Sequence, residues 1–76
     1  MISERLKSTI LKQLELEDYD IQDDTKANTV PGWDSLSHAN VILAIEKEYN
    51  IRLKHIEVLK CKNIGDLQVL VDSKLS

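Results

Sequence analysis

The sequence has few of the residues that build covalent or metal-bound scaffolds. Cys61 is the only cysteine among the 76 residues, which excludes a disulfide bond within the chain. Its expected role is that of a small, buried apolar residue. His38 and His55 do not combine with Cys61 at the spacing of a zinc site. An apolar core is therefore expected to hold the fold. Hydrophobic residues make up 42% of the sequence, which is enough for one small core.

The sequence also lacks an excess of positive charge and any long apolar run. Its net charge of −3 argues against generic binding of nucleic acid. No stretch approaches membrane-spanning length, and residues 1–5 contain no apolar run typical of a secretory signal. We therefore expect one domain over residues 1–76, a cytoplasmic monomer with no bound nucleic acid and no membrane insertion.

Residues suited to catalysis or metal binding are present, but they do not form the patterns that this chemistry needs. Asp34, Ser35 and His38 are the residue types of a hydrolase triad, yet adjacent helical side chains do not face each other. No Gly-x-Ser-x-Gly elbow is present. A calcium loop starting at Asp18 would have Asp23 where the turn needs Gly, and threonine where it needs Glu. We predict no catalytic residues and no metal ligands.

The first part of the chain predicts a helix followed by a long loop. Residues 2–16 have apolar side chains at steps of four, which is typical of an amphipathic helix. These side chains are Ile2, Leu6, Ile10 and Leu14, with Leu11 beside them. Residues 17–34 show no sustained period and are rich in acidic and turn-forming residues, so we predict a loop. Ile21 and Val30 are expected to anchor it to the core.

A second helix is predicted over residues 35–49. Pro31 and Gly32 form a turn before it, Asp34 is a suitable N-cap, and Asn50 can end the helix in a left-handed conformation. The predicted inward stripe consists of His38, Val41, Ile42, Ala44, Ile45 and Tyr49. The predicted outward side consists of Leu36, Ala39, Asn40, Leu43, Glu46 and Lys47.

Two shorter helices are predicted in the remaining part of the chain. The first covers roughly residues 55–60, with Ile56 and Leu59 turned inward. Asn63 is a candidate cap for the second, in which Gly65 weakens the first turn by about 1 kcal/mol relative to alanine. Its predicted core residues are Ile64, Leu67, Leu70, Val71 and Leu75. The predicted fold is an all-α four-helix bundle with a long first loop and a short third helix.

Ser35 is expected in the first turn of the second helix, with its hydroxyl pointing to solvent. From position alone, it can be an ordinary helix-start residue or a site for an anionic modification near the positive end of the helix dipole. The segment Asp34-Ser35-Leu36 stands mid-chain, after an acidic loop and between one long helix and two shorter ones. In this placement it resembles the modification motif of acyl carrier proteins, and the resemblance extends over residues 2–75.

The resemblance implies that the chain is a carrier, not an enzyme, and that Ser35 bears a 4'-phosphopantetheine arm. A separate phosphopantetheinyl transferase would attach the arm. Its terminal thiol would hold acyl groups as thioesters for acyl-loading, condensing or acyl-transfer enzymes of fatty-acid, polyketide or related specialised biosynthesis. The implied partner surface has an apolar centre of Leu36, Ala39 and Leu43 and a rim of Glu46, Lys47 and Glu48.

Two alternatives remain open at this point. One is a carrier of the peptidyl or D-alanyl type that is loaded by an adenylating enzyme, which would have the same fold and use the same Ser35. The other is a helical adaptor without a prosthetic group. The sequence barely separates the two kinds of carrier, whereas attachment of the arm would distinguish a carrier from an adaptor.

Charge is distributed unevenly along the chain. Residues 15–24 contain six acids and no base, whereas residues 52–62 contain four bases and one acid. These segments can be two solvated faces or parts of a partner surface. The sequence departs here from carriers of fatty-acid synthesis, in which the second and third helices are strongly acidic, because Asn40 and Lys47 replace acids. The segment 33–38 is more similar to stand-alone carriers of specialised pathways.

The resemblance also implies that an apolar cargo can be sheltered between the helices. The expected cavity lies under the second helix. We expect it to be lined by Val41, Ile45, Ile56, Cys61 and Leu67. Cys61 stands where a larger apolar side chain is expected, so unfilled space near it is the specific prediction.

Overall fold

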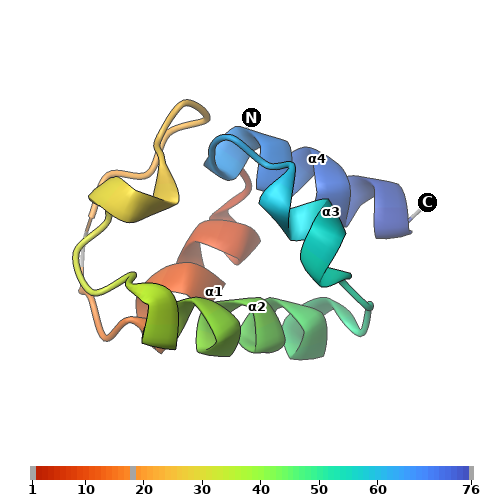
Figure 1. Cartoon of the computed structure of the whole chain (residues 1–76). Helices are drawn as coiled ribbons and strands as arrows, with labels where there is room; N and C mark the ends of the chain where they lie inside the picture. The colour runs from red at the N-terminus through yellow and green to blue at the C-terminus, as the bar shows by residue number, and fades with distance from the viewer. Residues whose placement is uncertain (1, 18, 76) are drawn as a thin grey trace.

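The computed structural model describes residues 2–17 and 19–75. Within these ranges it contains four α-helices, one short 3-10 helix and no strand, which confirms the all-α prediction. The helices are α1 (Glu4–Gln13), η1 (Ala27–Thr29), α2 (Ser35–Tyr49), α3 (His55–Leu59) and α4 (Ile64–Leu75). α1 packs against α2, and the short α3 leads obliquely from the end of α2 toward α4 (Figure 1).

Helix α1 is shorter than the predicted segment 2–16. It begins after Ser3, whose hydroxyl accepts a hydrogen bond from the Leu6 N–H at 3.2 Å. It ends because Glu15 adopts a left-handed conformation with φ of 59°. The Leu16 N–H then donates to the Leu11 carbonyl at 2.9 Å, which closes a Schellman-type end without glycine. This end was not predictable from the sequence, because glutamate rarely adopts that conformation.

Both ends of α2 lie where they were predicted. The Asp34 carboxylate accepts from the N–H groups of Leu36 at 3.0 Å and Ser37 at 2.8 Å. Asn50 is left-handed with φ of 55°, and its N–H donates to the Glu46 carbonyl. These contacts satisfy backbone groups that a helix end leaves free. They fix the point at which Ser35 enters the helix.

The long loop is held to the core at several points. Ile21 and Val30 are buried, as predicted. The Gly65 N–H donates to the Asp23 carbonyl, and the Ile64 N–H donates to the Thr25 carbonyl, each at 2.8 Å. The loop therefore supplies acceptors for the first turn of α4. The backbones approach so closely that a Cβ on Gly65 would lie 2.6 Å from the Asp23 carbonyl oxygen.

The predicted orientation of α3 is wrong. Ile56 and Leu59 were expected to face inward, but they are 63% and 66% exposed. Val58 is buried in their place, and Leu53, which precedes the helix, is buried in the same core cluster. A five-residue helix makes fewer than two turns, so its apolar spacing does not determine which side meets the core.

Helix α4 has the predicted cap and most of the predicted core. The Asn63 side chain accepts from the Asp66 N–H at 2.8 Å. Its buried apolar residues are Ile64, Leu67 and Val71, while Leu70 is half-buried. Leu75, expected in the core, is exposed. The buried position beside Val71 belongs to Gln68, whose side chain accepts from the Ser3 N–H at 2.9 Å.

Candidate functional site

The exposed Ser35 hydroxyl is the centre of the candidate site. Ser35 is the first residue of α2, and it makes no side-chain hydrogen bond with the described part of the chain. Asp34 beside it is engaged by the helix start. The Ser37 N–H, helped by that of Leu36, holds the pKa of the Asp34 carboxyl below its usual range. The site therefore presents a freely approachable primary hydroxyl on a rigid anchor.

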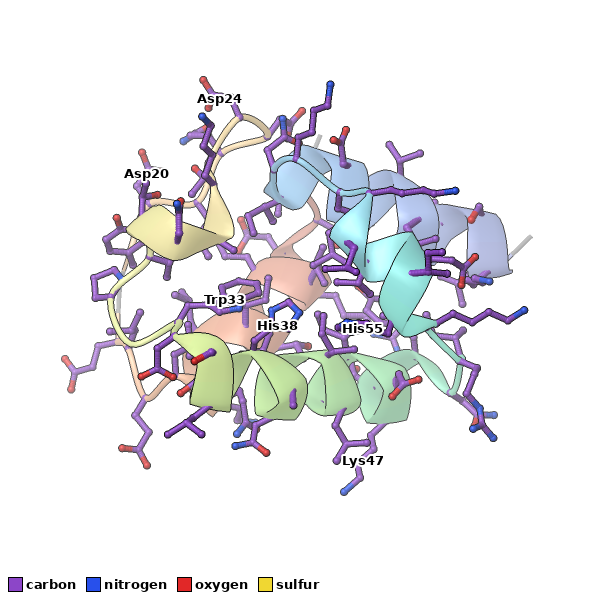
Figure 2. The ribbon with its side chains drawn as sticks, viewed as in Figure 1. Asp20, Asp24, Trp33, His38, Lys47 and His55 are labelled. Atoms are coloured by element: carbon purple, nitrogen blue, oxygen red, sulfur yellow. The ribbon has the colours of Figure 1, made fainter. Side chains whose placement is uncertain are left out.

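Trp33 and His38 fix the backbone on either side of Ser35. The indole Nε1–H of the buried Trp33 donates to Nδ1 of the half-buried His38 at 3.0 Å. This bond requires an unprotonated Nδ1, so the neutral ring has its proton on Nε2. The two rings lie together above the start of α2 (Figure 2). The sequence analysis missed this pair, although Trp33 and His38 are the N′ and N4 positions around the Asp34 cap, which commonly contact each other at a helix start.

A small pocket of about 60 Å³ lies beside this pair, between the start of α2 and the α3–α4 connection. Cys61 and Leu67 line it, as predicted. The other three predicted lining residues are corrected, because Val41 and Ile45 are packed deeper in the core and Ile56 is exposed. The remaining lining residues are Ala27, Trp33, His38, Ile42, Val58, Lys62, Asn63 and Ile64. Their convergence depends on tertiary packing that the apolar periodicity does not encode.

Cys61 is half-buried at the edge of this pocket. Burial raises the pKa of its thiol, and the carboxylates of Asp66 and Glu57 raise it further. The Sγ–H donates to the Glu57 carbonyl at 3.6 Å. The thiol is therefore kept in its protonated, weakly nucleophilic form. Its contribution to the site is the small volume of its side chain.

The comparisons with known proteins agree with this geometry. No family model matches the chain. The structure is similar to the solution structure of a holo acyl carrier protein from Geobacter metallireducens, with a TM-score of 0.83 and 36% sequence identity. The match covers 96% of this chain and 87% of that one.

The chain belongs to the acyl carrier protein family. This confirms the expected four-helix bundle with a short third helix. Among the described residues of this carrier, no side chain forms a hydrogen bond with the Ser35 hydroxyl.

The outward side of α2 in this carrier contains an exposed apolar stripe. Leu36 is 84% exposed and Leu43 is 49% exposed, and Ala39 between them is also exposed. Lys47 projects from the same helix away from the other helices (Figure 2). These positions suit contact with another protein, and that role remains a prediction.

The outward orientation expected for Glu46 is corrected. Glu46 is half-buried, and its carboxylate accepts from the Leu53 N–H at 2.8 Å, which secures the segment after α2. Glu48 is exposed but forms an ion pair with Arg5 of α1 at 2.8 Å. The sequence could not reveal these contacts, because they depend on how the neighbouring segments fold back on α2.

No group of three or more histidine, cysteine, aspartate or glutamate side chains in the described ranges could hold a metal ion. Asp18, the first position of the rejected calcium loop, lies outside the described residues. None of the helices in residues 2–17 and 19–75 combines the length and apolar character needed to cross a membrane.

Proposed function

We propose that this chain carries acyl intermediates as thioesters on a 4'-phosphopantetheine arm attached to Ser35. The observation that carries the proposal is the free, exposed Ser35 hydroxyl at the capped start of α2 in a member of the carrier family. The residues present suit this group, because a phosphate ester on Ser35 would lie beside the positive end of the α2 dipole. When bound, the group supplies a terminal thiol that forms thioesters.

The transferase and this chain would contribute different parts of the attachment reaction. In the reaction of a phosphopantetheinyl transferase, the Ser35 oxygen would form a phosphodiester bond with the phosphorus of coenzyme A that bears the pantetheine, and the pyrophosphate bond would break with release of adenosine 3',5'-bisphosphate. The transferase would supply the metal and the base that takes the hydroxyl proton. The chain contributes a fixed anchor and a surface for acyl-loading, condensing or acyl-transfer enzymes. We assign these partners to fatty-acid, polyketide or related specialised biosynthesis.

Intact mass tests the proposal directly. The purified chain is incubated with coenzyme A and a permissive phosphopantetheinyl transferase. We expect a mass increase that corresponds to one phosphopantetheine group. No increase, with a known carrier modified in a parallel reaction, would favour the adaptor alternative.

Leu43→Glu should weaken transfer to partner enzymes and leave the fold almost unchanged. Leu43 is half-exposed on α2, so the free energy of unfolding should fall by less than about 1 kcal/mol. A carboxylate would be desolvated at the apolar centre of the contact, so kcat/KM for acyl transfer should fall about ten-fold. The measurements are thermal unfolding and transfer kinetics with the phosphopantetheinylated chain.

The control for Leu43→Glu is Val69→Glu, which adds the same charge at an exposed apolar position of α4. Transfer should be nearly unchanged in this variant. An equal loss of transfer in both variants would show that added negative charge, and not the α2 surface, causes the defect.

Cys61→Leu should stabilise the unacylated chain and reduce the extra stability given by acylation. The pocket beside Cys61 is far smaller than a cavity of about 150 Å³ that binds benzene, so only a short or terminal part of a cargo fits. Filling it should add about 0.5–2 kcal/mol to the free energy of unfolding. An acyl chain that occupies this pocket in the native state, but has no such site in the unfolded state, would also stabilise the fold.

Thermal melts of the unacylated and acylated forms, each with Cys61 and with leucine, measure this coupling. Cys61→Ser is a useful comparison, because it keeps the small volume of the side chain. Equal stabilisation by the acyl group in all backgrounds would place the cargo away from Cys61.

A further inference from the structure

The two glutamates of α2 interact with other residues of the chain. Glu46 accepts from the Leu53 N–H, and Glu48 is paired with Arg5, each at 2.8 Å. Arg5 also donates to the Glu48 carbonyl at 2.7 Å and lies over the Tyr49 ring. Both carboxylates thus have partners within the chain, and neither points freely from the outward side of α2.

The acids after α2 are engaged in the same way. Glu57 binds the Lys74 ammonium at 2.8 Å, and its pKa is lowered first by this hydrogen bond and then by the Lys54 N–H. Asp66 accepts from the Lys62 N–H at 2.9 Å. With Asp34 at its helix cap, all five acids between positions 34 and 66 accept internal hydrogen bonds.

All basic side chains of the same segment are exposed, and none forms an ion pair within the described ranges. They are Lys47, Arg52, Lys54, Lys60 and Lys62. Besides the Lys74 hydrogen bond, the ammonium of Lys54 helps to lower the pKa of the Glu57 carboxyl, so the charge of Lys54 is partly offset. The segment from 34 to 66 has a formal net charge of zero. However, two of its carboxylates, Glu48 and Glu57, form ion pairs with Arg5 and Lys74, which lie outside this segment. Its unoccupied charges are therefore positive.

Two exposed apolar side chains stand between these cations in the sequence. Ile56 and Leu59 are three apart on α3, so they lie on one face of that helix. We name Arg52, Lys54, Ile56, Leu59 and Lys60 the α3 patch. In the sequence this apolar pair stands between exposed cations, Arg52 and Lys54 before it and Lys60 after it, which is the composition of a protein contact with an apolar centre and a polar rim.

We propose that the α3 patch docks on a partner enzyme surface with an apolar centre and an acidic rim. This inference rests on the proposed carrier function and names the surface chemistry of its partner. Complementary charge would raise the association rate and suppress partners whose docking surfaces are basic. The acids of the first loop, such as Asp20 and Asp24, project from a different side of the molecule than the α3 region (Figure 2). The resulting charge separation would orient the approaching chain.

The test uses two helical peptides as defined probes, each with leucines along one face. The other face has glutamates in the first peptide and lysines in the second. Each is titrated into the phosphopantetheinylated chain, and amide NMR shifts are followed. We expect the leucine–glutamate peptide to shift signals of the α3 patch, with an affinity that falls as salt is raised. Preferential binding of the leucine–lysine peptide to this patch would overturn the proposal.

Arg52→Glu and Lys26→Glu form a matched pair of variants, because both residues are exposed in coil just before a short helix. Arg52→Glu should weaken binding of the leucine–glutamate peptide about five-fold. Lys26→Glu should change it less than two-fold. Equal effects of the two variants would show that peptide binding depends on the net charge of the chain and not on the α3 patch, which would overturn the proposal.

Two further measurements separate the possible failures. Intact mass establishes beforehand whether the arm is attached, so failure of the carrier function is seen independently of peptide binding. Sedimentation of the chain alone tests for self-association. If the chain forms a salt-sensitive dimer, and Arg52→Glu abolishes this dimer, then a second copy of the chain occupies the α3 patch. That result would contradict the proposal.

Discussion

Ser35→Ala should yield a folded chain that gains no phosphopantetheine mass. The Ser35 hydroxyl is exposed and unbonded among the described residues, so its removal should change the free energy of unfolding by no more than about 0.5 kcal/mol. Alanine also suits the first turn of α2, because it is the best helix former. Loss of modification should therefore be complete while circular dichroism and thermal unfolding stay nearly unchanged.

The control for Ser35→Ala is Ser37→Ala, which removes a hydroxyl from the same helical turn. Ser37 is half-buried, and its hydroxyl bonds to the Asp34 carboxylate, so this variant should lose slight stability and still accept the arm. If the Ser35→Ala chain gains the arm, or the Ser37→Ala chain does not, the assignment of the attachment site to Ser35 is wrong.

Gly65→Ala should destabilise the chain, although helix propensity alone predicts a gain of about 1 kcal/mol. The added Cβ would lie 2.6 Å from the Asp23 carbonyl oxygen and 3.1 Å from the Asp23 Cα. This neighbour is backbone, so it can move only by stretching the hydrogen bonds that Gly65 and Ile64 donate to the loop. We expect a loss of about 2–3 kcal/mol and a fall in Tm of about 10 °C or more.

The matched control is Val69→Ala, an alanine substitution at an exposed position of the same helix. Its effect on the free energy of unfolding should lie within about 0.5 kcal/mol. A stabilising Gly65→Ala substitution would show that the loop yields at low cost and that α4 is not clamped by Asp23. Denaturant unfolding of both variants, followed by circular dichroism, provides the comparison.

The sequence by itself determined the features that depend on neighbouring residues. Asp34 and Asn50 mark the two ends of α2. They were predictable because a cap needs only the side chain or backbone conformation of one residue next to the helix. The 15-residue α2 and the 12-residue α4 are long enough for apolar spacing to identify most of their core positions. The same local pattern placed Ser35 at an exposed helix start, which is the basis of the functional proposal.

Only the tertiary structure decided the features in which distant segments meet. The face of α3, the partners of Glu46 and Glu48, and the lining of the small pocket depend on how helices pack against each other. Gly65 is the sharpest case, because its local propensity opposes the helix while the approach of the Asp23 backbone requires the absence of a side chain. These contacts are set by the packed volume around each residue, which no periodicity along the chain encodes.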